Sequence, residues 1–367
     1  MEARLSIILS ILIIVSNAVL LILGSIGGRK ASKNLIWYLS ISTVIALAMF
    51  AFKINPGVTT DLSRHFSTYY KIKEAGYSAE TSIDALVTIK VIFYIITKIG
   101  TLRLIAVVSA IISYSTFFFL LSRDTKEKNI KVAILLYSII SFFGLCSNYY
   151  IFTGIKTAIA FSLLSLFIYH YNKGNKKIAI LFMVLSCFSH SASIIYILLY
   201  FVTRGKKNKP WKMAIPLLIM IFYSIAPTLI NTTNIPFLSY IFSKIEAYSS
   251  SDILSSKLEI YVMDLIYCAF LSYRYFKTAK NCEDEETKRI IDVLKYDSVF
   301  ILLSSLVSKI MVERGLMLLS FLNHKNIIEE QKEKGHRKTI YMIIDMIYFT
   351  VKICYFIVRL LAHTAIY

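Results

Sequence analysis

Apolar runs long enough to cross a lipid bilayer recur along the whole of this 367-residue chain, of which 57% is hydrophobic. The first run, Leu5 to Ile26, is about 22 residues long, and about 20 apolar residues in a helix span the hydrocarbon core of a membrane. Lipid offers the backbone no hydrogen-bond partners, so runs of this length fold as helices, which satisfy their own backbone groups. The sequence therefore predicts an all-α polytopic membrane protein, with residues 1–367 forming a single integral membrane domain.

Basic residues between the apolar runs predict how the chain is threaded through the membrane, because short loops rich in lysine and arginine stay on the cytoplasmic side. The first run is too long and wrongly flanked for a cleaved signal peptide, so the amino terminus is expected outside. Inner loops are predicted at 27–34, 122–131, 172–177, 203–212, 277–289 and 325–338, and outer loops at 55–82, near 148 and at 231–259. Apolar segments near 5–26, 35–54, 102–121, 132–150, 155–171, 213–230, 259–276 and 339–362, with two hairpins described below, predict about 10–12 transmembrane or re-entrant helices.

The net charge of +19 raises the question of a nucleic-acid partner. The basic residues are dispersed among short loops rather than gathered in one groove, so we interpret them as topology signals and expect no nucleic acid. The five cysteines are an odd number, and most of them fall within apolar runs. They are predicted to be small hydrophobic residues rather than a disulfide framework.

One apolar stretch, 178–202, has a basic cluster at each end and one ionisable side chain, His190, at its middle. If both clusters are cytoplasmic, the stretch enters the membrane and returns, and each arm of about 12 residues reaches about 18 Å, short of the roughly 30 Å core. His190 would then lie at the tip of a broken helical hairpin, where an ionisable group marks a functional site by default. The alternative is one ordinary spanning helix. Cys187 has a metal-like spacing from His190, but nothing supplies the remaining ligands, so no zinc site is predicted.

The stretch 299–322 poses the same problem, because it too must leave the inner side and return to it. Glu313 and Arg314 are predicted to mark its turn. Residues 83–99 are apolar but carry charged side chains, so they are predicted to lie in the outer interface or to re-enter. The loop 55–82 and the hairpins 178–202 and 299–322 are proposed to form the functional site.

The outer loop 55–82 is predicted to contain a helix that begins at Asp61, because a carboxylate favours a helix amino terminus. Asp61, Arg64, His65 and Thr68 then share a face, since residues three and four apart are neighbours on a helix. A carboxylate, a guanidinium and an imidazole there suit the binding of a phosphorylated sugar and the movement of a proton. The alternative is a solvated helix whose aspartate only caps it.

Other residues are predicted to join this loop. Lys156 begins an apolar helix just after an outer turn, and with His190 and Arg314 it would form an anion site in a pocket of low dielectric constant. A lysine that reaches out to the membrane interface is the alternative for Lys156. Tyr69 and Tyr70 are placed to stack on sugar faces, and an interfacial aromatic belt explains them equally well.

Four short motifs, in this order, resemble a known family. They are Gly57-Val-Thr-Thr-Asp61 followed by Tyr69-Tyr70, then Gly154-Ile-Lys156, then Phe188-Ser-His190-Ser191, and finally Val312-Glu313-Arg314. Across about residues 55–320 the chain resembles the EpsG-like family of Wzy-type polysaccharide repeat-unit polymerases. It departs from the family where Lys156 replaces a usual arginine and where Arg64-His65 interrupts a stretch that is often rich in tyrosine. Lysine keeps the charge but loses the two-pronged geometry that suits phosphate.

The resemblance implies a multi-helix glycosyltransferase of GT-C-like architecture in the inner (plasma) membrane of a bacterium. It implies that a glycan on undecaprenyl pyrophosphate is passed onto a new lipid-linked repeat unit at the outer face, which produces O-antigen, capsule or exopolysaccharide. The implied partners are these lipid-linked glycans, membrane lipid, a chain-length-regulating copolymerase and the flippase of the same pathway.

Such a transfer needs a base at the acceptor hydroxyl and positive charge at the departing pyrophosphate. On the resemblance we assign Arg314 and Lys156 to the pyrophosphate and either His190 or Asp61 to the base. Arg64, His65, Tyr69 and Tyr70 are assigned to substrate binding. These residues require no metal or other cofactor, and a divalent cation at the pyrophosphate stays open.

Two other classes of function remain open from the sequence. A flippase or other transporter of lipid-linked oligosaccharides would use the same charges to bind a pyrophosphate, with a cavity that opens to both sides. A membrane acyltransferase that modifies the polysaccharide would place its histidine where an activated acyl donor arrives from the cytoplasm.

Overall fold

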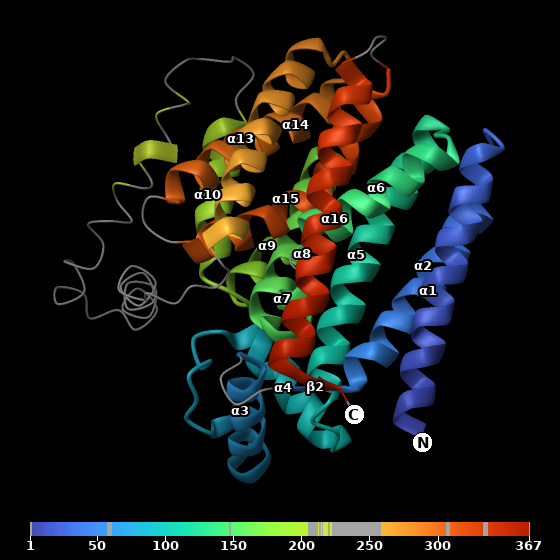
Figure 1. The fold of residues 1–367 in the computed structure, drawn as a ribbon. Helices are drawn as coiled ribbons and strands as arrows, with labels where there is room; N and C mark the ends of the chain where they lie inside the picture. Colours follow the sequence, from blue (N-terminus) through green and yellow to red (C-terminus); the bar gives the residue numbers. More distant parts are fainter. Residues whose placement is uncertain are drawn as a thin grey trace.

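The computed structural model describes residues 2–56, 61–146, 148–204, 258–305, 309–332 and 337–366, together with a few single positions between 205 and 257. The predicted apolar segment 213–230 and most of the predicted outer loop 231–259 lie outside the described residues, as do residues 57–60 of the first motif. Figure 1 shows the course of the chain.

The chain is an all-α polytopic membrane protein, as the sequence predicts. Among the described residues, four helical segments are long and apolar enough to cross a membrane, Ser6–Ile26, Lys33–Phe52, Leu104–Thr125 and Thr339–Val358. They belong to α1 (Glu2–Ile26), α2 (Lys33–Phe52), α5 (Leu104–Lys128) and α16 (Arg337–His363). The other helices are α3 (Asp61–Ala75), α4 (Val87–Ile99), α6 (Val132–Leu145), α7 (Asn148–Thr153), α8 (Ile155–Asn172), α9 (Lys176–Cys187), α10 (Ala192–Thr203), α13 (Leu258–Asn281), α14 (Glu285–Ser304) and α15 (Lys309–Glu330).

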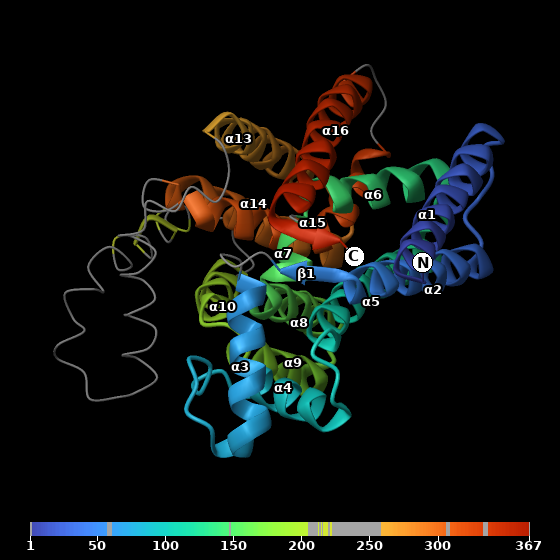
Figure 2. The same cartoon turned by 60° about the horizontal axis from the view of Figure 1, so that its bottom comes forward.

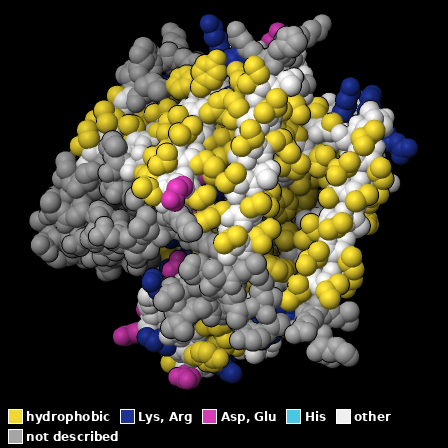
Figure 3. Space-filling model, in the orientation of Figure 1, with side chains coloured by type: hydrophobic (Ala, Val, Ile, Leu, Met, Phe, Trp, Pro, Cys, Tyr) yellow, Lys and Arg dark blue, Asp and Glu magenta, His cyan; other side chains and the backbone are white. Residues whose placement is uncertain are grey.

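The surface has the pattern expected of a protein in lipid. Hydrophobic side chains cover most of the described face in Figure 3, and lysines and arginines gather toward its top and bottom. On α1, large apolar side chains such as Ile11 and Leu12 are more than half exposed, at 52% and 58%. The five cysteines are free thiols, three of them buried, which agrees with their prediction as small hydrophobic residues.

Helices α3 and α4 lie together at one end of the molecule, near both termini (Figures 1 and 2). At this end a short antiparallel ladder joins β1 (Ile54–Pro56) to β2 (Thr364–Ile366), so the chain after α2 is fixed to the chain after α16. The predicted helix at Asp61 is confirmed as α3. We call this end of the molecule the α3 end.

The helix break predicted at His190 is present. Helix α9 ends at Cys187, α10 begins at Ala192, and each has 12 residues. The amide of Thr88, at the start of α4, donates to the carbonyl of Phe188 at 3.2 Å, and its hydroxyl donates to the carbonyl of Leu185 at 3.2 Å. The turn around His190 is therefore held against α4.

Glu313 and Arg314 do not mark the turn of the second hairpin, so that prediction is wrong. Helix α14 ends at Ser304 and α15 begins at Lys309, so both residues lie inside α15. The hydroxyls of Ser304 and Ser305 donate to carbonyls three residues back, at 2.8 and 2.6 Å, and such bonds compete with the helical pattern. The break between α14 and α15 therefore lies at Ser304 and Ser305 and not at Glu313 and Arg314.

Helix α15 is the central helix, because every residue from Met311 to Glu330 is buried. Its polar side chains are not confined to one face, and the charged ones among them are stable inside a protein only when they are paired. The predicted inner loops at 122–131, 277–289 and 325–338 are largely the ends of α5, α13, α14 and α15. Their charges extend helices rather than form open loops.

The outer turn predicted near Asn148 is instead the short buried helix α7. The amide of Asn148 donates to the carbonyls of Phe143 and Cys146 at 2.8 and 3.1 Å, and its carbonyl oxygen accepts from the hydroxyl of Tyr114 at 3.0 Å. These bonds satisfy a polar side chain in the interior, so α7 brings its tyrosines into the molecule rather than into solvent.

Candidate functional site

The first charged contact at the α3 end joins residues that are far apart in sequence. Asp61 lies in the first turn of α3, where its carboxylate faces the positive end of the helix. A guanidinium nitrogen of Arg314, from α15, lies 3.9 Å from one Asp61 oxygen, and Arg64 lies 3.4 Å from the other. The Arg314 side chain is 10% exposed and that of Arg64 is 74% exposed. The structure thus brings Arg314 to Asp61, as the sequence predicts.

Helix α7 supplies the support for Arg314. The hydroxyl of Tyr150 donates to Glu313 at 2.9 Å, and the guanidinium carbon of Arg314 lies 5.7 Å from the centre of the same ring. One tyrosine therefore contacts both members of the Glu313-Arg314 pair. Sequence reasoning did not single out Tyr150, although it lies four residues before the motif at Gly154.

His65 is buried one turn after Asp61, with 3% of its surface exposed. Its ring meets the ring of Phe93, from α4, edge to face at 5.5 Å. The pKa of His65 is lowered from 6.5 to about 3, first by burial and second by the positive charge of Lys156. Asp61 acts in the opposite direction and Arg64 in the same direction as Lys156. His65 is therefore neutral at physiological pH.

The four residues predicted to share one face of α3 differ in exposure. Arg64 is exposed, Asp61 is half-buried, and His65 and Thr68 are buried. Tyr69 is buried at 1% exposure, and Tyr70 beside it is 52% exposed. The predicted roles of Tyr69 and Tyr70 therefore fall on different faces of the helix.

His190 is buried in the break between α9 and α10, at 6% exposure. Its Nδ1 accepts a hydrogen bond from the amide of Ala192 at 3.1 Å. In a neutral imidazole with Nδ1 as acceptor, the proton is on Nε2, which is then a donor.

A ring contact fixes the level of His190 relative to Lys156. The rings of Phe161 in α8 and Tyr196 in α10 meet at 5.5 Å. Lys156 lies five residues before Phe161, and His190 lies six residues before Tyr196. At about 1.5 Å per residue both are about 8–9 Å from that contact, toward the start of their helices. Both helices begin near α4 and α7, so Lys156 and His190 lie at the α3 end.

Tyr196 also connects the first hairpin to the second. A Cβ built at Gly315 would lie 3.0 Å from the Tyr196 hydroxyl and would clash with Ile301 of α14. Glycine at 315 therefore lets α10 and α14 approach α15 directly after Arg314. We define the α3 cluster as Asp61, Arg64, His65, Tyr150, Lys156, His190, Glu313 and Arg314.

A second set of buried charges escaped the sequence analysis. Arg274 of α13 donates to Asp345 at 2.7 Å and to Glu330 at 2.9 Å, and Lys352 donates to Asp264 at 2.8 Å. The hydroxyls of Tyr267 and Tyr137 donate to Asp345, and that of Tyr348 donates to Asp264. We define the buried network as Asp264, Arg274, Glu330, Asp345 and Lys352. The available signal was the presence of charged residues inside the predicted apolar segments 259–276 and 339–362.

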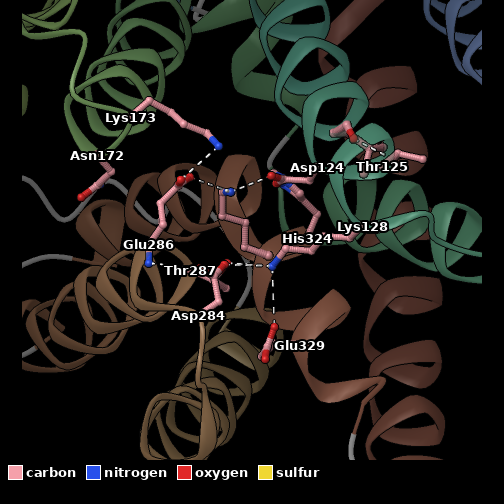
Figure 4. Close-up of polar contacts among 12 residues, drawn as sticks. Asp124, Thr125, Lys128, Asn172, Lys173, Asp284, Glu286, Thr287, His324 and Glu329 are labelled. Carbon is pink, nitrogen blue, oxygen red and sulfur yellow. Dashed lines mark hydrogen bonds and ion pairs between the residues drawn. The ribbon is translucent and has the colours of Figure 1, made fainter.

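Further ion pairs join helix ends away from α3 (Figure 4). Asp124 of α5 accepts from His324 at 2.6 Å, and Lys173, after α8, lies 3.0 Å from Glu286 of α14. Lys128 donates to Thr287 at 2.7 Å. In the part of the chain that the structure describes, no group of three or more His, Cys, Asp or Glu side chains could hold a metal ion.

Comparison with known proteins gives one match. The model of the EpsG family matches residues 99–365. No curated protein and no solved structure matches the chain. The matched range contains Lys156, His190 and Arg314, whereas α3 lies before it. The resemblance that the four motifs indicated is therefore confirmed over most of the chain.

Proposed function

The chain belongs to the EpsG family, and from this premise we propose that it polymerises undecaprenyl-pyrophosphate-linked repeat units into an extracellular polysaccharide at the outer face of the bacterial plasma membrane. The reaction is a glycosyl transfer from one lipid-linked glycan to another. The product is an exopolysaccharide, a capsule or an O-antigen, and a copolymerase and a flippase act in the same pathway.

The observation that carries this proposal is the meeting of Arg314, Lys156 and Asp61 at one end of the molecule. These residues come from α15, α8 and α3, and the charge of Lys156 reaches His65, one turn from Asp61. Two cations in a largely buried setting provide a binding site for a pyrophosphate, because charge-assisted hydrogen bonds strengthen as water is excluded.

We assign Arg314 and Lys156 to the departing pyrophosphate. The 3.9 Å pair between Arg314 and Asp61 is long for a hydrogen-bonded ion pair, so Arg314 can exchange this partner for a phosphate oxygen. Tyr150 holds Glu313 and supports the guanidinium, which keeps Arg314 in place during the exchange.

His190 and Asp61 remain the candidates that the sequence offered for the base, and their contacts favour other roles. Nδ1 of His190 accepts from the amide of Ala192, so a neutral imidazole has its proton on Nε2 and offers no second nitrogen to take a substrate proton. Asp61 has Arg314 near one oxygen and Arg64 near the other, which suits it to orient Arg314 before the donor arrives. Arg64, which is exposed, is assigned to the entering glycan.

The test of the proposed function is the length of the glycan in a deletion strain, resolved on a gel. A single repeat unit on the lipid anchor, with long chains restored by the wild-type gene, is the expected result. Complete loss of surface sugar would indicate a flippase instead. Normal ladders with altered decoration would indicate an acyltransferase.

A further inference from the structure

Two polar atoms on one face of α3 are buried without a hydrogen-bond partner among the described residues. They are Nε2 of His65 and the hydroxyl of Tyr69. The two residues are four apart, so their side chains lie one above the other on the helix. Buried polar groups are nearly always hydrogen-bonded in native proteins, and an unsatisfied one calls for an explanation.

The rest of α3 shows that the two atoms are exceptional. The hydroxyl of Thr68, which is also buried, donates to the carbonyl of Arg64 at 3.0 Å. Tyr70 is on the exposed face, where an interfacial aromatic residue is expected. An aromatic belt therefore explains Tyr70 but leaves Tyr69 unexplained.

The surroundings of His65 and Tyr69 suit part of a sugar. Phe93 backs the imidazole with an apolar face, and Lys156 acts on it electrostatically from α8. On its own helix, Asp61 and Arg64 act on it as well, and Arg314 of α15 reaches Asp61. Lys90 of α4 is occupied by Asp84 and by the carbonyl of Ala79, at 2.7 and 2.9 Å. The two unsatisfied atoms thus lie beside the cations assigned to the pyrophosphate.

We propose that His65 and Tyr69 form the acceptor-sugar subsite of the polymerase, in which Nε2 of His65 takes the proton of the attacking hydroxyl and the Tyr69 hydroxyl binds a neighbouring hydroxyl of the same sugar. This inference rests on the proposed function. It names His65 as the base in place of His190 and Asp61, and it names Tyr69 as a residue that recognises the acceptor.

The transfer step balances as follows for these residues. The acceptor hydroxyl gives its proton to Nε2 of His65, which requires the resting proton of the imidazole to be on Nδ1. The acceptor oxygen forms a bond to the anomeric carbon of the donor glycan. The bond between that carbon and the pyrophosphate oxygen breaks, and its electron pair leaves with the pyrophosphate beside Arg314 and Lys156. The imidazolium then releases its proton to the departing lipid pyrophosphate or to water.

The charge of Lys156 explains how a weakly basic histidine can act as the general base of the transfer. In the free protein, burial and Lys156 depress the pKa of His65. A pyrophosphate bound at Lys156 adds negative charge that offsets the lysine's positive charge, and a nearby negative charge raises the pKa of an imidazole. His65 therefore becomes a stronger base once the donor is bound, which links the activation of the acceptor to the presence of the donor.

The experiment uses purified full-length protein in lipid nanodiscs and the lipid-linked repeat unit extracted from the deletion strain. His65→Ala is expected to lower turnover by about 100-fold or more, as for loss of a general base. His65→Gln, which keeps a hydrogen-bonding group but takes no proton, is expected to lose turnover with an unchanged acceptor KM.

Tyr69→Phe is expected to raise the acceptor KM by about tenfold, as for one lost hydrogen bond to a substrate. Tyr200→Phe, at a fully buried tyrosine of α10, is the matched control.

Rescue of His65→Ala by added imidazoles separates a chemical role from a structural one. The restored rate is expected to increase with the pKa of the imidazole, as general-base catalysis requires. The inference is overturned if the turnover of His65→Gln equals that of wild type. It is overturned as well if no imidazole restores turnover to His65→Ala while Asp61→Asn is as inactive as His65→Ala. It is also overturned if Tyr69→Phe and Tyr200→Phe behave alike. Failure of the wild-type protein to extend the lipid-linked unit would instead reject the proposed function.

Discussion

The α3 cluster and the buried network each join an arginine to an aspartate from another helix, but the two ion pairs differ in length and in exposure to solvent. Arg274 and Asp345 have side chains with no exposed surface, and they lie 2.7 Å apart. Arg314 lies 3.9 Å from Asp61, whose side chain is 35% exposed. The first ion pair is short and closed to solvent, whereas the second is longer and its aspartate is partly open to solvent. The first therefore suits a role in holding helices together, and the second suits the role in substrate binding that we propose for it.

The physical reason lies in desolvation. Removing an ion from water is costly, so a fully buried ion persists only with close partners on every side. Arg274 meets this condition through Glu330 and Asp345, which fix α13 to α15 and α16. In the α3 cluster the Asp61 side chain is 35% exposed, so contact with solvent reduces the same cost there.

The largest effect is expected at Arg314. Arg314→Ala removes the main positive charge from the departing group and is expected to lower polymerisation by about 100-fold, comparable to loss of one transition-state donor. The unfolding temperature should also fall, because Arg314 is only 8% exposed and contacts the ring of Tyr150. Glycan length in cells and thermal unfolding in detergent measure the two effects. A normal ladder at normal protein level would remove Arg314 from the site.

Loss of stability is the main effect expected for Arg274. Arg274→Met leaves Asp345 and Glu330 as buried charges without their partner and should destabilise the fold by about 3–5 kcal/mol. Thermal unfolding in detergent measures it, and replacing all three residues by apolar ones of similar volume should recover most of the loss. If Arg274→Met unfolds like wild type, the contrast between the two regions is unfounded.

The pH dependence of stability should distinguish His65 from other histidines. Its folded-state pKa of about 3 lies below its ordinary value of 6.5, so the unfolded chain binds the proton first and stability falls as pH drops below 6.5. Between pH 7 and pH 5 this amounts to about 2 kcal/mol. His65→Gln, without substrate, should therefore lose less stability over that range. If the curves of stability against pH are parallel for wild type and His65→Gln, His65 is solvated and this prediction is wrong.

The smallest effect is expected for Lys156→Arg. This change keeps the charge and introduces a planar guanidinium that suits phosphate, so activity should stay within about threefold of wild type or rise. Lys156→Met is the control that removes the charge, and it should reduce activity clearly more than the arginine does. Equal activity of both variants would place the pyrophosphate elsewhere.

The sequence predicted the helix that begins at Asp61 and the break at His190, because both depend on local patterns. A carboxylate at a helix start, and an apolar stretch too short to cross the membrane twice, are visible in the chain itself. The position of the second turn was wrong, because charged residues were taken as turn markers and instead lie inside the buried helix α15.

The buried network could not be predicted as pairs. Lys352 and Asp264 are 88 residues apart, and nothing local indicates which carboxylate meets which cation. Tyr150 was missed for the same reason, because its hydrogen bond in the α3 cluster is to Glu313, which is 163 residues away in the chain. The presence of charges in apolar segments was visible, but their partners were not.

The sequence by itself determined that this protein is a helical membrane protein of one family, because hydropathy, basic loops and short motifs follow from neighbouring residues. Only the tertiary structure decided which charges meet across helices and how closely, and that Nε2 of His65 and the hydroxyl of Tyr69 are buried with no hydrogen-bond partner among the described residues. The reason is that pairing and burial depend on helices that are distant in the chain and adjacent in space, where the local dielectric environment sets what each charge can do.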